Sequence, residues 1–258
     1  MSAVRRIALW CVTRVWNVLP DRAIYQAVGW WYPRRREPEI RLVDQMMPAG
    51  GVAVDVGVWY GPWTKALARR ASVVHAFEPQ PDLCRFLRKV CEPNVVVHQL
   101  AISDVSGVTE LWTDEGAPVL NGLGSIEHSG GSMTAISVRT APLDASHLRD
   151  VRLLKIDVEG HEAAVLRGAT ATIDRERPRI VIEIEQRHLD CPIFDIFDQL
   201  HAHRYRGYAL RVGVPESLEK FDLDRDQLAW VDHLPAREYV NNFVFIPDED
   251  PWVPSGES

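Results

Sequence analysis

The chain has 258 residues, which is enough for one large α/β domain with a substantial core. Its net charge of −7 at pH 7 argues against a general nucleic-acid-binding protein, because such a protein needs a basic surface. No apolar stretch is long enough to span a bilayer, and the four Cys show no metal-ligand spacing. These features favour a cytoplasmic protein with reduced thiols.

The first 41 residues differ in charge from the rest of the chain. They contain eight Arg, three acidic residues and four of the nine Trp. Apolar residues recur at helical spacing between Val4 and Leu19, and Arg14 interrupts the run, so we expect a helix and no signal peptide. We favour packing of this helix on the domain or on a second subunit. The alternative is a helix that lies on a membrane surface or covers the substrate, so a homodimer and a peripheral membrane contact both stay open.

From Gly51 onward, predicted strands and helices alternate, which indicates a doubly wound, mostly parallel sheet. Buried strands are predicted at 52–56, 73–77, 95–100, 153–158, 180–185, 205–211 and 243–246, and a more exposed strand pair at 108–113 and 135–139. Helices are predicted at 62–70, 81–91, 162–174 and 194–203. Residues 116–132 are rich in Gly and are a candidate mobile loop. We expect an N-terminal helical extension (1–48), an α/β domain (49–247) and a flexible tail (248–258).

Two of the predicted strands end in carboxylates. One runs into Asp157 and Glu159, and the other into Glu183 and Glu185. Because side chains alternate along a strand, each pair of acids shares one side of the sheet. Ligands of open α/β sheets bind at the carboxyl ends of the strands. The sequence therefore predicts an acidic cluster there that can hold a cation or take up a proton. Lys155, inside an apolar strand, is expected to pair with a carboxylate.

The first strand ends in Asp55 and is followed by Gly57 and Gly61, a turn that lets the backbone approach a ligand closely. The dinucleotide fingerprint has Gly where Asp55 stands, and an acid there suits a positively charged ligand such as S-adenosylmethionine. Glu78 ends the second strand, where a carboxylate can accept both ribose hydroxyls. Beyond the third strand, Ile102 can pack on an adenine, with the backbone of Ala101, Ile102 and Ser103 reading its edge.

These segments resemble the FkbM-type family of S-adenosylmethionine-dependent O-methyltransferases. The matching strings are VDVGVWYG, AFEPQP, LAISD, SVRTAPLD, LLKIDVEGHEAAVLRGA and PRIVIEIE. The resemblance implies a Rossmann-like fold with a seven-stranded sheet. It also implies cofactor contacts from Asp55, Gly57, Tyr60, Gly61, Thr64, Glu78, Pro79, Ala101, Ile102 and Ser103. The family often has Gly-Ala-Asn after its first Asp-Val, whereas here Val58, Trp59 and Tyr60 follow Gly57.

Methyl transfer to a hydroxyl requires that the acceptor oxygen lose its proton as it attacks. A divalent cation can lower the pKa of that hydroxyl, so we expect Mg²⁺ held by Asp157 and Glu183, with Glu185 as a third candidate ligand. For the general base we favour His161 over Glu159, because His titrates near neutral pH. The alternative is that Glu159 caps a helix and His161 bonds locally. His188 is expected to be a solvated loop residue.

The acceptor follows from the resemblance alone. The family methylates hydroxyls of sugars, glycolipids, polysaccharides and polyketides, and Trp59, Tyr60 and Trp63 could stack on sugar rings. We expect a sugar hydroxyl on a bacterial glycan, polysaccharide or glycolipid precursor, with no role for nucleic acid. The alternatives are an NAD-dependent oxidoreductase or epimerase, against which Asp55 argues, and a catalytically silent, methyltransferase-like binding protein.

Overall fold

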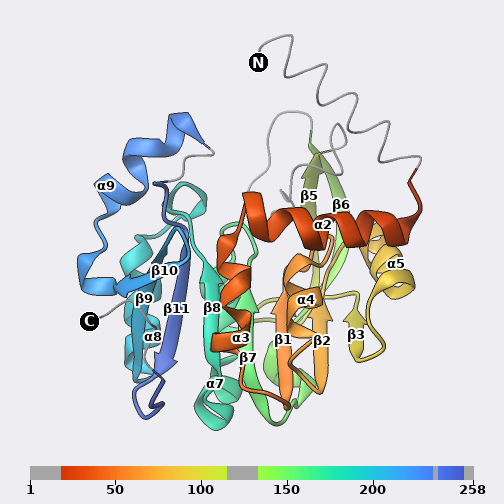
Figure 1. Cartoon of the computed structure of the whole chain (residues 1–258), viewed down its shortest axis with the longest axis horizontal. Coiled ribbons are helices and arrows are strands. Elements are labelled where there is room, and N and C mark those ends of the chain that lie inside the picture. Colours follow the sequence, from red (N-terminus) through yellow and green to blue (C-terminus); the bar gives the residue numbers. More distant parts are fainter. Residues whose placement is uncertain (1–18, 115–132, 235–237, 253–258) are drawn as a thin grey trace.

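A computed structural model describes residues 19–114, 133–234 and 238–252. Its centre is an eight-stranded sheet in the order β10-β9-β11-β8-β7-β1-β2-β3 (Figure 1). Most of the predicted N-terminal helix and the Gly-rich segment 116–132 lie outside the described residues. Within the described ranges, no helix combines the length and apolar character that crossing a membrane requires.

The sheet is mostly parallel, as predicted. Its strands are β1 (Val52–Val56), β2 (Val73–Phe77), β3 (Val95–His98), β7 (Val151–Ile156), β8 (Arg179–Glu183), β9 (Tyr205–Arg211), β10 (Val214–Ser217) and β11 (Asn242–Pro247). Strand β1 pairs in parallel with β2 and β7, β2 with β3, and β7 with β8, whereas β11 runs antiparallel to β8 and β9. The carboxyl ends of β1, β2, β7 and β8 therefore meet at one edge.

The eighth strand, β10, was not predicted. It forms a hairpin with β9 in which Arg211 pairs with Val214, so only Val212 and Gly213 form the turn. Both have positive φ, 53° and 76°. Such two-residue turns usually carry Asn, Asp or Gly first, and a β-branched Val hides the signal. Pro215 is tolerated because β10 is an edge strand.

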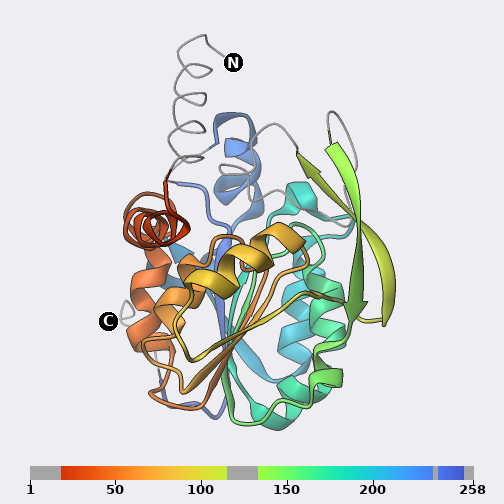
Figure 2. The same cartoon turned by 90° about the vertical axis from the view of Figure 1, so that its right-hand side faces the viewer.

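A second, three-stranded sheet has the order β4-β6-β5 and consists of β4 (Ala101–Ile102), β5 (Gly107–Asp114) and β6 (Met133–Ala141). Strands β5 and β6 are the predicted exposed pair, in antiparallel register from Gly107 with Thr140 to Asp114 with Met133. Figure 2 shows this ribbon at one side of the molecule. The single strand predicted at 95–100 is divided, because β3 ends at His98 and β4 joins the second sheet.

Helices cover both faces of the main sheet (Figure 2). One face carries the 3₁₀ helix η1 (Pro38–Leu42), α3 (Val43–Met46), α4 (Pro62–Leu67) and α5 (Pro81–Val90), and the other α6 (Glu162–Gly168), α7 (Thr170–Glu176) and α8 (Ile193–Ala202). Short helices η2 (Leu143–Ser146), η3 (Gln186–His188), η4 (Leu218–Lys220), α9 (Leu223–Asp226) and η5 (Leu228–His233) complete the described chain. Helix α2 (Asp21–Arg35) lies across one end of the sheet (Figure 1).

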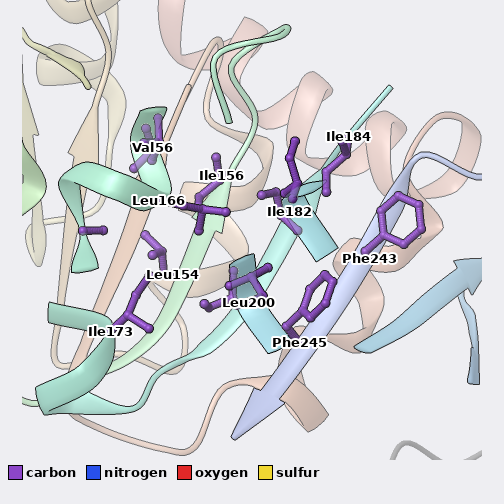
Figure 3. Close-up of a cluster of buried hydrophobic side chains, with 14 of the residues drawn as sticks. Val56, Leu154, Ile156, Leu166, Ile173, Ile182, Ile184, Leu200, Phe243 and Phe245 are labelled. Carbon is purple, nitrogen blue, oxygen red and sulfur yellow. The ribbon is translucent and has the colours of Figure 1, made fainter. Parts of the chain in front are cut away.

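The core on the α6–α8 side is built from alternate residues of the buried strands. Figure 3 shows Leu154 and Ile156 of β7 and Ile182 of β8 facing Leu166 and Leu200 of the helices. All five side chains are at most 1% exposed. A strand that is apolar at every position is buried on both faces of a parallel sheet. This burial holds the strands in place, and with them the polar residues at their ends.

Residues 248–252, at the start of the segment expected to be a flexible tail, are bonded to three arginines. Arg177 pairs with Glu249, and Arg179 with Asp250 at 2.7 Å. Arg206 donates to the carbonyls of Asp248, Asp250 and Trp252. This part of the segment therefore lies against the domain.

The helix predicted at 162–174 is two helices, α6 and α7, and Gly168 explains where the first one ends. A Cβ built at Gly168 would lie 1.9 Å from the carbonyl oxygen of Ser103, so α6 packs directly on the backbone that follows β4. This contact sets the distance between α6 and the segment of Ala101 and Ile102. Only glycine allows such a close approach.

We predict that Gly168→Ala lowers the free energy of unfolding by about 1–3 kcal/mol, although Ala normally favours a helix. The matched control is Gly107→Ala, where the nearest atom to a new Cβ is the Thr140 hydroxyl at 3.7 Å. Urea unfolding of both variants tests this. A Gly168→Ala protein as stable as the Gly107→Ala protein would contradict the packing argument.

Candidate active site

A pocket opens where the carboxyl ends of β1, β2, β7 and β8 meet, as the strand-end residues predicted. Nine of the predicted site residues line it: Gly57, Glu78, Pro79, Ala101, Ile102, Asp157, Glu159, His161 and Glu183. Tyr32 of α2 (Asp21–Arg35) and Glu37, directly before η1, complete one wall. The other predicted residues, namely Asp55, Tyr60, Gly61, Thr64, Ser103 and Glu185, do not line the pocket.

Asp55 lies beneath the pocket. It is 1% exposed, and its carboxylate accepts a hydrogen bond from the Thr64 hydroxyl, which joins the end of β1 to α4. Burial raises the pKa of Asp55 to about 7. The next turn residue, Gly57, has φ 83°, and a Cβ there would lie 1.7 Å from the Asp157 carbonyl oxygen. Gly57 therefore lets the loops after β1 and β7 come together under the pocket.

The carboxylate of Glu78 is fixed by two backbone donors. The backbone N–H of Trp59 donates to one carboxylate oxygen at 3.0 Å, and that of Gln80 to the other at 2.9 Å. The side chain is only 3% exposed, and burial raises its pKa to about 7. Trp59 reaches this position with a φ of 53°, which is uncommon outside glycine.

Three carboxylates converge in the pocket. Single oxygens of Glu37, Asp157 and Glu183 all lie within 4.8 Å of one another. The indole N–H of Trp63 donates to Glu37, and the Asn241 amide donates to Glu183 at 2.6 Å. Burial and the charges of its two neighbours raise the pKa of Glu183 well above its ordinary value. Glu37 was not predicted as a site residue, because a single acid after an Arg-rich run carries no ligand spacing.

Lys155 lies under these carboxylates, which confirms the pairing expected for it. The ammonium nitrogen is 3.5 Å from Asp157 Oδ2, donates to the Ile156 carbonyl and lies over the Trp63 ring at 5.2 Å. The side chain is fully buried. Burial alone would lower the pKa of Lys155, but the charges of Asp157, Glu37 and Glu183 raise it above its ordinary value.

Glu185 stands outside the three-carboxylate group. It pairs with Arg187 and accepts hydrogen bonds from Tyr239 at 2.7 Å and Asn241 at 3.3 Å. Burial alone would raise its pKa, but the hydrogen bonds from Arg187 and Tyr239 lower it. Its carboxylate is therefore ionised and already has partners.

The two residues predicted as bases both line the pocket but have different neighbours. The His161 ring lies 2.9 Å from the Ser103 hydroxyl, on the side of Ala101 and Ile102. The Glu159 carboxylate lies 3.2 Å from Nε2 of His188. Burial and the charges of Asp157 and Glu185 raise the pKa of Glu159 to about 8. The prediction of a solvated His188 was wrong, since its side chain is 17% exposed and faces Glu159.

With this geometry established, comparison with known families identifies the chain. The family model described as "Methyltransferase FkbM domain" matches residues 51–208. The chain belongs to the FkbM methyltransferase domain family. This membership supports a methyltransferase that uses S-adenosylmethionine, and it confirms the resemblance of the sequence motifs. No curated protein matches the chain.

Solved structures with a similar fold share little sequence. The methyltransferase FkbM from Methylobacillus flagellatus KT is 14% identical, with a TM-score of 0.49 over 81% of this chain and 51% of that chain. This chain thus spans about half the length of that protein. SMU.1697c, a putative methyltransferase from Streptococcus mutans in complex with SAH, is 10% identical, with a TM-score of 0.42 over 81% and 95%.

We predict that Lys155→Met lowers the free energy of unfolding by about 3 kcal/mol, because it leaves buried carboxylates without their cation. The control is Lys89→Met, which removes a 60% exposed ammonium 3.1 Å from Asp21 and should cost about 1 kcal/mol or less. Denaturant unfolding in the presence of a chelator compares the two variants. An equal, small effect would show that Lys155 does not compensate the acidic group.

Proposed function

We propose that the chain is an S-adenosylmethionine-dependent O-methyltransferase acting on a sugar hydroxyl of a glycan, polysaccharide or glycolipid precursor. The observation that carries this proposal is the position of Glu78 in the same pocket as the three carboxylates. Glu78 suits the binding of a nucleoside, and the three carboxylates suit the activation of a hydroxyl. The family match favours methyl transfer over the oxidoreductase and epimerase alternatives.

The nucleoside is proposed to lie between Glu78 and the segment of Ala101 and Ile102. The ribose hydroxyls would donate to Glu78, whose two backbone donors fix the carboxylate before the ligand arrives. Ile102 and Pro79 offer apolar contacts, and Gly57 lets the backbone approach the methionine end. The predicted cofactor residues that do not line the pocket would hold the turn after β1 and its flanking elements in place. They are Asp55, Tyr60, Gly61, Thr64 and Ser103.

The three carboxylates fit a divalent cation. With Lys155 at 3.5 Å from Asp157, the group of Glu37, Asp157 and Glu183 retains an excess of two negative charges when all are ionised. Hard carboxylate oxygens favour Mg²⁺, with water completing its shell. A bound cation would lower the pKa of the acceptor hydroxyl and fix its position. Because Glu185 already has partners, this proposal assigns the role of third cation ligand to Glu37 in its place.

We place the general base in the pair of Glu159 and His188, with His161 as the alternative. Glu159 is two residues from Asp157, lines the pocket and can pass a proton to Nε2 of His188, 3.2 Å from its carboxylate. The His161 ring is directed to Ser103, beside the proposed adenine contacts. The proton of the acceptor hydroxyl would therefore move to Glu159 as the oxygen attacks the methyl carbon.

Aromatic rings at the pocket suit a sugar acceptor. Tyr32 and Trp59 both line it, with ring centroids 5.1 Å apart. Trp63, which we expected to stack on a sugar, is 4% exposed and bonds Glu37 instead. Among the described residues, the pocket lining has no Lys or Arg that could pair with an anionic acceptor, which supports a neutral sugar.

Binding of S-adenosylhomocysteine should depend on Glu78. We predict that Glu78→Gln weakens binding at least tenfold, because a charge-assisted pair of ribose hydrogen bonds is lost. Wild-type affinity should rise from pH 6 to pH 8, since burial raises the pKa of Glu78 to about 7 and only the ionised form accepts both hydroxyls. The variant should show no such rise. Calorimetric titration of both proteins tests this, and equal affinities would refute the ribose assignment.

Mg²⁺ should stabilise the protein through the three carboxylates. We predict that Mg²⁺ raises Tm of the wild type and that Asp157→Asn or Glu183→Gln removes the rise. Glu185→Gln is the matched control and should keep it. Differential scanning calorimetry with and without Mg²⁺ measures these shifts. No rise in the wild type at millimolar Mg²⁺ would exclude the cation from the proposal.

Substitution of the two base candidates should separate them. We predict that Glu159→Gln lowers the methyl-transfer rate by about 10²–10⁴-fold at saturating S-adenosylmethionine. His161→Ala should have a smaller effect on the rate and a larger one on cofactor binding, because the ring lies at Ser103. Single-turnover kinetics distinguishes these effects. The reverse order would restore His161 as the base.

A further inference from the structure

A basic groove lies outside the pocket, where α2, η1 and α4 meet. Its charged lining residues are all cationic: Arg34, Arg41, Lys65 and Arg69. In the ranges that the structure describes, the three arginines have no carboxylate within 4.0 Å. Lys65 donates to Gln26 and lies 4.8 Å over the Tyr25 ring, and the acid whose charge acts on it is Glu92, which forms no ion pair with it within 4.0 Å. The groove therefore concentrates positive charge on a chain whose net charge is −7.

Two large aromatic side chains of α2, directly after the groove residue Gly29 in the chain, are exposed. Trp30 is 62% exposed, on the side of α2 opposite its buried residues Ile24 and Val28, and Trp31, three residues after Val28, is 41% exposed. The Arg34 guanidinium lies 4.7 Å over the Trp30 ring. Trp and Arg together are typical of helices at the boundary between water and lipid, where the indole enters the headgroup layer.

We infer that α2 and the basic groove dock on a bilayer that contains anionic phospholipid. The lipid phosphates would pair with Arg34, Arg41 and Arg69, and Trp30 and Trp31 would enter the interface. The positive charge of the groove matches the negative charge of such a bilayer, and the two exposed indoles match its boundary between water and lipid. This inference concerns localisation of the protein and stands independently of the reaction proposed for the pocket.

A nucleic acid would also pair with the arginines, but the neighbouring pocket argues against it. Pro62 lines both the groove and the pocket, and Tyr32 of the pocket lies 6.2 Å from Trp31 between ring centroids. A polyanion on the groove would therefore extend toward the carboxylates of Glu37 and Asp157. A membrane keeps its phosphates in one plane, so its lipids can pair with the groove without a continuous polyanion entering the pocket.

Sedimentation of the full chain with vesicles tests the inference. We expect binding to phosphatidylcholine vesicles that contain phosphatidylglycerol and none to phosphatidylcholine alone. The triple variant Arg34→Ala, Arg41→Ala, Arg69→Ala should bind at least tenfold more weakly, since each basic residue near such a surface contributes about fivefold. Trp30→Ala should weaken binding as well.

The matched control removes three exposed arginines from other faces: Arg85→Ala, Arg149→Ala, Arg204→Ala. It should bind like the wild type, and calorimetric unfolding confirms that both triple variants are folded. Three outcomes would overturn the inference. The first is no binding of the wild type to anionic vesicles, and the second is equal binding by the two triple variants. The third is that the wild type binds poly(U) but not vesicles, and that the groove variant no longer binds poly(U).

Discussion

The arrangement of the pocket depends on a fully buried lysine beneath three carboxylates. Lys155 lies on a central strand, 3.5 Å from Asp157, and its charge acts on Glu37 and Glu183 as well. Carboxylates this close together in a buried site would be prohibitively costly without a cation. Lys155 compensates part of this charge, and the proposed cation would neutralise the remainder. Strand β7 therefore carries the lysine, and the first residue after its end is Asp157, the acid that the lysine stabilises.

Glu37 makes the N-terminal segment part of this electrostatic unit. Its carboxylate is buried, bonded to the indole of Trp63 and close to Lys155. Tyr32, five residues earlier, forms the neighbouring wall. The segment that precedes the sheet therefore contributes charge and an aromatic surface to the pocket.

Much of the fold and of the pocket lining contributed by the strand ends was predictable, because both depend on local signals. Apolar strands ending in Asp157 and Glu183 identify the edge at which they meet. Glu37, in contrast, reaches the site through tertiary packing of a loop far from those strands. The contact of Glu159 with His188, and the Tyr239 and Asn241 partners of Glu185, likewise depend on side-chain directions that no spacing encodes.

The most direct test is a crystal structure of the protein with S-adenosylhomocysteine and Mn²⁺, whose anomalous signal locates the ion in place of Mg²⁺. The account predicts ribose hydroxyls on Glu78 and the ion among Glu37, Asp157 and Glu183. A nucleoside bound away from Glu78, or an ion held by Glu185 or absent from the three carboxylates, would contradict it.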